Sequence, residues 1–177
     1  MTTYPLLACQ ALLLAVFGLA AVSKLTRRGF GEFVAATGRL LPARWSRGRR
    51  PVALGVLAAE LATVCLLAWP AVAPVGFGMA AGLGTGFSAA VVAALRRGER
   101  GPCRCLGATT TPLGGSQLAR NGAVVTAALA GLLLAGWSEP VPVGLAGVGL
   151  AALAGLALAG LVVRIDDLVA LFAPMPT

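Results

Sequence analysis

Five long apolar blocks dominate this chain and limit what it can fold into. Each is about as long as the roughly 20 residues with which an α-helix crosses a bilayer. In lipid, backbone polar groups must be satisfied within the segment, so such blocks form helices. We therefore expect an all-α integral membrane protein in a single domain over residues 1–177. The expected spans are about 4–23, 51–69, 75–95, 118–137 and 143–163.

The composition excludes several other classes. The chain is 58% hydrophobic and 11% charged, whereas a soluble domain carries roughly 25% charged residues. The net charge of +8 does not indicate nucleic-acid binding, because the basic residues lie at the ends of apolar blocks, where they set orientation. The chain has no histidine, which excludes histidine metal sites, haem ligation by histidine and catalytic histidines.

The basic residues predict the topology. All 14 Lys and Arg residues fall in two long loops, 24–50 and 96–117, in the C-terminal tail, or at the membrane edge of the same side. The short turns that follow Trp69 and Trp137 hold only Glu139 as a charged residue. No basic residue precedes the first block, so we expect a retained helix and not a signal peptide. The positive-inside rule then places the N-terminus outside and both loops in the cytoplasm, in the cell membrane.

Two further patterns bear on packing. Small residues at four-residue spacing predict close helix contacts. They occur at Gly78, Gly82 and Gly86, and again at Ala151, Gly155 and Ala159. The first loop contains apolar residues at helical spacing, which predict a short interfacial helix ending near Pro42; they are Phe30, Phe33, Val34, Leu40 and Leu41.

The second loop carries a Cys-x-Cys pair, Cys103 and Cys105, around Arg104. In extended backbone, residues i and i+2 lie on one side, so the two sulfurs can meet one partner atom or each other. Neighbouring arginines favour thiolate, the form that attacks disulfides. Lasting structural disulfides are rare in the cytosol. The pair is therefore interpreted as redox-active, with soft-metal binding or no role as the alternatives.

The other two cysteines fall at similar depths in neighbouring spans. Helix rise puts Cys9 about 7 Å and Cys65 about 9 Å below the outer face. A disulfide would need Cα atoms within about 7 Å of one another. They are either an outer redox pair or small apolar fillers.

Polar residues also occur within or beside the spans. Glu60 falls near the middle of the second span, where a carboxyl group is expensive and often handles protons. The same arithmetic gives Thr85 as its expected partner and leaves no basic residue at that depth. Lys24, Arg120 and Asn121 fall at the inner ends of spans, where we expect the basic side chains to reach the headgroups; the alternative is that they hold the Cys-x-Cys loop or an anion.

Taken in order, these residues resemble the methylamine-utilisation MauE family, which is related to DoxX-like membrane proteins. The resemblance covers roughly residues 5–137. It depends on Ser23-Lys24-Leu25, Leu40-Leu41-Pro42, Glu60-Leu61, Cys103-x-Cys105-Leu106-Gly107 and Arg120-Asn121. It implies a four-helix transmembrane bundle, to which the block at 143–163 adds a fifth helix. It also implies thiol–disulfide chemistry beside a thioredoxin-like partner, in the maturation of a disulfide-rich secreted protein.

The sequence thus predicts a membrane thiol–disulfide redox protein, and so a thiol–disulfide oxidoreductase if its chemistry is catalytic. It would pass reducing equivalents between thioredoxin-like partners on the two sides of the membrane. No cofactor is required by any motif, but a bound quinone or a helix movement would have to bridge roughly 20 Å between the two cysteine pairs. The alternatives are a soft-metal carrier that uses the two thiolates, with no metal ligands assigned, and a non-catalytic membrane scaffold.

Overall fold

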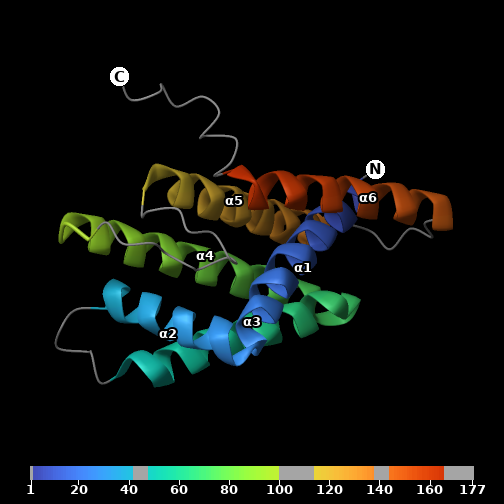
Figure 1. Cartoon of the computed structure of the whole chain (residues 1–177). Coiled ribbons are helices and arrows are strands. Elements are labelled where there is room, and N and C mark those ends of the chain that lie inside the picture. Colours follow the sequence, from blue (N-terminus) through green and yellow to red (C-terminus); the bar gives the residue numbers. More distant parts are fainter. Residues whose placement is uncertain (1, 42–47, 100–113, 138–143, 166–177) are drawn as a thin grey trace.

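The computed structural model describes residues 2–41, 48–99, 114–137 and 144–165, which are almost entirely helical. The helices are shown in Figure 1. They are α1 (Thr3–Leu25), α2 (Arg27–Leu40), α3 (Arg49–Ala68), the 3₁₀ turn η2 (Pro70–Val72), α4 (Ala73–Arg96), α5 (Gly115–Trp137) and α6 (Leu145–Val163).

Within the described residues, five helices are long and apolar enough to cross a membrane. They are α1, α3, α4 together with η2, α5 and α6. The predicted fold class is therefore confirmed. Each expected span coincides with one of these helices, with boundaries that differ by a few residues. The additional helix α2 lies between the first and second spans.

The ends of the bundle differ in composition. One end, on the left of Figure 1, contains the start of α3, the end of α4 and the start of α5. We call it the basic end, because Arg49, Arg50, Arg96 and Arg97 lie there. The other end, on the right, contains the start of α1, η2 and the end of α5; we call it the short-turn end.

The apolar core lies among α1, α3, α4 and α5. Leu13, Phe17, Leu67 and Phe77 are buried there in one cluster. The side-chain amide of Gln10 donates a hydrogen bond to the Leu67 carbonyl and ties α1 to α3. This contact satisfies a polar side chain that lipid could not.

Helix α6 packs mainly against α1. Ala151, Gly155 and Ala159 are buried, and a Cβ atom on Gly155 would overlap the carbonyl oxygen of Ala8. The second small-residue stripe therefore forms the close helix contact that the sequence predicts.

The first stripe does not form one, and that prediction is wrong. Gly78, Gly82 and Gly86 are exposed, and a Cβ atom on any of them would meet nothing within 4 Å. The packed face of α4 instead contains Gly76 and Gly84, where an added Cβ would lie 2.9 Å from Leu67 and 2.7 Å from Val125, respectively. Two stripes at the same spacing run along one helix, and spacing alone does not say which faces protein.

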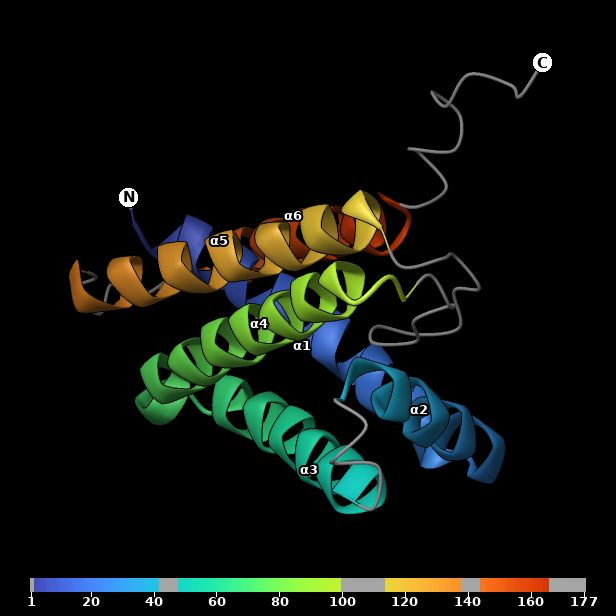
Figure 2. The ribbon, with the colours of Figure 1, turned by 90° about the vertical axis from the view of Figure 1, so that its left-hand side faces the viewer.

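Helix α2 packs against α1, α3 and α4 (Figure 2). Phe33, Ala36, Thr37 and Leu40 are buried. The helix and its end near residue 41 are as predicted, but its apolar face is covered by protein and not left to the membrane interface. The cause is the separation of α3 from α4 toward the basic end, which leaves room for α2 between them (Figure 2).

Candidate functional site

The site begins where α1 ends. Thr26 has extended backbone and stops α1, and its hydroxyl accepts a 3.0 Å hydrogen bond from the Gly29 N–H, which caps α2. The turn is so tight that a Cβ atom on Gly29 would overlap the Ser23 carbonyl oxygen. This break holds Lys24 in the last turn of α1, facing the interior of the bundle.

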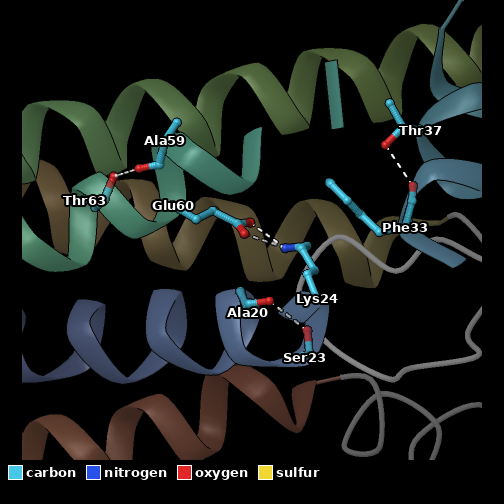
Figure 3. Close-up of polar contacts among 8 residues, drawn as sticks. All are labelled: Ala20, Ser23, Lys24, Phe33, Thr37, Ala59, Glu60 and Thr63. Atoms are coloured by element: carbon cyan, nitrogen blue, oxygen red, sulfur yellow. Dashed lines mark hydrogen bonds and ion pairs between the residues drawn. The ribbon is translucent and has the colours of Figure 1, made fainter. Parts of the chain in front are cut away.

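Lys24 forms a buried ion pair with Glu60 of α3 (Figure 3). Its Nζ atom lies 2.6 Å from Oε1 and 2.8 Å from Oε2 of the carboxylate. The exposed fractions of Lys24 and Glu60 are 2% and 0%. The ammonium also lies over the ring of Phe33, 4.6 Å from its centroid. One cation thus joins α1, α2 and α3.

The prediction that Thr85 is the partner of Glu60 is therefore wrong. Thr85 is exposed on α4, and the basic residue said to be missing at that depth is Lys24. Lys24 was expected at the inner membrane edge because α1 was expected to end there. In the structure the chain continues from α1 into α2, so the end of α1 lies level with the middle of α3 (Figure 1).

A second polar group lies in the first two turns of α5. Gln117, Arg120 and Asn121 are all buried, and the guanidinium Nη2 of Arg120 donates a 2.6 Å hydrogen bond to Gln117 Oε1. Among the described residues, Nε2 of Gln117 has no hydrogen-bond partner.

The expectation that Lys24 and Arg120 reach out to headgroups is wrong for both. The exposed fraction of Arg120 is 0%. Buried charges require partners, and the interfaces between helices supply them: a carboxylate for Lys24 and a side-chain amide for Arg120. Both groups lie inside the bundle, the first at the middle of α3 and the second at the start of α5.

The structure describes two of the four cysteines, Cys9 and Cys65. Cys9 is half-buried against the apolar core, Cys65 is exposed, and both are free thiols. The contact between Gln10 and Leu67 brings α1 and α3 together at their level, but Cys65 faces away from the core. Cys103, Cys105 and Arg104 lie outside the described residues. The part of the chain that the structure describes holds no group of three or more His, Cys, Asp or Glu side chains that could bind a metal ion.

A cavity of about 280 Å³ lies between α2, α3 and α4. Its lining is almost entirely apolar and includes Phe33, Thr37, Val56, Gly86 and Phe87. Because Phe33 also contacts the Lys24 ammonium, one aromatic ring is shared by the cavity wall and the ion pair.

Sequence reasoning missed two residues of this site. Phe33 was interpreted only as part of an apolar helix face, and Gln117 was not singled out. A usable signal existed for the ion pair: Lys24 and Glu60 are opposite charges at the end and in the middle of two apolar segments, and ionisable residues in such segments usually pair. For Gln117, the signal was its spacing of three residues from Arg120, which puts both on one helix face.

The five membrane-crossing helices, with an ion pair and a buried arginine inside them, define a multi-pass helical membrane protein. The family model of the methylamine utilisation protein MauE matches residues 2–134. The chain belongs to this family, and α6 lies beyond the matched residues. Comparison with curated proteins and with solved structures gives no match.

Proposed function

We propose that this MauE-family protein is a thiol–disulfide redox protein of the cell membrane. Cys103 and Cys105 are its redox pair, and thioredoxin-like proteins are its partners. In this proposal the N-terminus lies outside, and the basic end with the Cys-x-Cys loop faces the cytoplasm, as the positive-inside rule requires.

The observation that carries the proposal is the buried arginine after the cysteine-bearing loop. Arg120 follows Cys105 by 15 residues in the chain and is fully buried at the start of α5. A guanidinium held away from water attracts an anion more strongly than an exposed one. A loop thiolate is such an anion, and cationic neighbours lower the pKa of a cysteine thiol. Arg104 adds a second cation between the two cysteines.

The exchange step transfers two electrons and two protons from the partner to the cysteine pair. A thiolate of a reduced thioredoxin-like partner attacks one sulfur of the Cys103–Cys105 disulfide and forms a mixed disulfide. The partner's second thiol then displaces the remaining cysteine. The partner leaves as a disulfide, and Cys103 and Cys105 have gained two electrons and two protons.

The buried ion pair has a supporting role in this proposal. Lys24 and Glu60 join three helices at the middle of α3, and a carboxylate inside a membrane protein often handles protons. Glu60, acting with Lys24, is the proposed proton-handling group. Cys9 and Cys65 stay a proposed outer pair, which requires rotation of Cys65 toward α1.

Trapping the thiols in intact cells tests the function. We expect acid quenching followed by maleimide labelling to show a Cys103–Cys105 disulfide that forms under oxidant and clears under reductant. Cys103→Ser and Cys105→Ser each abolish it. Thiols that react only after a chelator is added would indicate metal binding, and thiols indifferent to every oxidant and reductant would indicate a scaffold.

The role of Arg120 has a matched control. We expect Arg120→Gln to slow maleimide labelling of the reduced loop thiols about tenfold at neutral pH, which corresponds to a thiol pKa higher by about one unit. Arg96→Gln removes an exposed arginine from the end of α4, and we expect it to change the rate much less. Equal rates in the two variants would remove Arg120 from the redox site.

A further inference from the structure

We propose that the cavity between α2, α3 and α4 binds the ring of a membrane quinone, which accepts the reducing equivalents of the Cys103–Cys105 dithiol. This inference depends on the proposed function for its redox step, while the binding site itself depends only on the cavity.

The cavity is open space within the membrane-spanning part of the bundle. It measures about 280 Å³, close to the lower limit of about 300 Å³ for small-molecule sites. Gly82 and Gly86 form part of its α4 wall, and a Cβ atom on either would meet nothing within 4 Å. These glycines therefore keep the volume free and do not serve helix contact.

The lining fits a flat ring with oxygen substituents. Phe33 and Phe87 bring two aromatic rings to the wall, and aromatic rings favour stacked or edge-on contacts with other rings. Among the lining side chains that the structure describes, the one polar group is the Thr37 hydroxyl, which donates a 2.8 Å hydrogen bond to the Phe33 carbonyl. A hydroxyl can rotate and also accepts, so Thr37 could donate to a quinone oxygen or accept from a hydroquinone.

Two features connect the cavity to the redox site. Phe33 lines the cavity, and its ring centroid lies 4.6 Å from the Lys24 Nζ atom, so an ionisable pair contacts the wall of a site proposed for a ligand that takes up protons. At the basic end, Arg97 donates a 2.7 Å hydrogen bond to the Leu40 carbonyl, and Leu40 lines the cavity. Cys103 follows Arg97 by six residues, a reach of at most about 20 Å of chain.

The chemistry selects a quinone over a lipid acyl chain. Oxidation of two thiols to a disulfide releases two electrons and two protons, and a quinone takes up both pairs to become a hydroquinone. Two S–H bonds break, one S–S bond forms, and the protons end on the two quinone oxygens. An acyl chain would fill the same volume but accepts no electrons.

Photolabelling of the full chain tests the site. The protein is placed in quinone-free phospholipid nanodiscs with an azido-benzoquinone that carries a decyl tail, and labelled residues are mapped by mass spectrometry. We expect label on α2 and α4 around Phe33 and Phe87. Gly86→Leu fills the cavity and should reduce labelling at least tenfold. Gly78→Leu, which is also exposed on α4 but outside the cavity, should retain it.

Further variants and a competitor distinguish quinone binding from acyl-chain binding. Gly82→Leu repeats the blocking test should Gly86→Leu unfold. Labelling that is equal in the blocked and control variants, or that a decyl chain without the ring suppresses equally, overturns the quinone site in favour of an acyl chain. The Cys103→Ser, Cys105→Ser double variant should keep full labelling. If the wild-type thiols prove inert while labelling persists, the redox function fails and the binding site stands.

Discussion

Lys24 and Glu60, 36 residues apart in the chain, lie within 2.6 Å of each other inside the bundle. An ammonium and a carboxylate are expensive to bury singly, and each is tolerated here because the other neutralises it. The pair fixes the end of α1 against the middle of α3. It also lies close to the start of α2, because only Leu25 and Thr26 separate Lys24 from that helix.

Breaking this pair should destabilise the protein strongly. We expect Glu60→Gln to reduce the free energy of unfolding by about 3–5 kcal/mol, because it leaves a buried ammonium unneutralised. The Lys24→Met, Glu60→Met double variant should recover most of that loss. Unfolding in detergent, followed by circular dichroism, measures both. Arg28→Gln, which breaks the exposed pair with Glu32, serves as the control and should change little. A double variant less stable than Glu60→Gln would contradict this account.

The break between α1 and α2 should tolerate no side chain at Gly29. Gly29→Ala places a methyl group on the Ser23 carbonyl oxygen, so we expect it to displace α2 and lower the unfolding temperature. Gly31→Ala, two residues on in the same helix, meets nothing within 4 Å and should stabilise by up to about 1 kcal/mol through helix propensity. Equal unfolding temperatures for the two variants would show that the turn is looser than described.

The contact between α4 and α5 allows a compensation test. A Cβ atom on Gly131 would overlap the Phe77 ring, so Gly131→Val should destabilise the bundle. Phe77→Ala removes the ring and should itself cost about 3–5 kcal/mol. We expect the double variant to lose less than the sum of the two by about 0.5–3 kcal/mol, the usual coupling of residues in contact. Strict additivity in a double-mutant cycle would contradict the contact; Gly136→Val, in open space, is the control.

The two thiols in the spans should differ in reactivity. Cys65 is exposed and Cys9 is half-buried, so a membrane-permeable maleimide should modify Cys65 several times faster in detergent micelles. Mass spectrometry of the intact protein, with Cys65→Ser and Cys9→Ser to assign each rate, measures the difference. Equal rates, or protection of Cys65 that disappears in Cys9→Ser, would instead support a paired state.

The sequence predicted the helices better than their contacts. Blocks of about 20 apolar residues determine that spans exist, because the bilayer accepts few alternatives. Hydrophobicity does not reveal tilt or rotation, since lipid and protein interiors are equally apolar. Lys24 was therefore expected outside the bundle interior, and the stripe at Gly78, Gly82 and Gly86 was expected to form a helix contact that does not exist. The contact of the α6 stripe was predicted correctly: Gly155 packs closely against α1.

The polar residues were found from the sequence, but their pairing was not. Glu60, Lys24, Arg120 and Asn121 stood out because charged and amide groups are rare in apolar segments. Which of these side chains meet depends on a helix break at Thr26. A single threonine in the sequence does not predict such a break.

The packing of α6 against α1 joins the first and last of the spans that the structure describes. During synthesis, the surface of α1 around Ala8 cannot be covered by its partner until residues 145–163 have been made. The contacts of α1 are therefore complete only after α6 has been made, although α1 itself is synthesised more than 100 residues earlier.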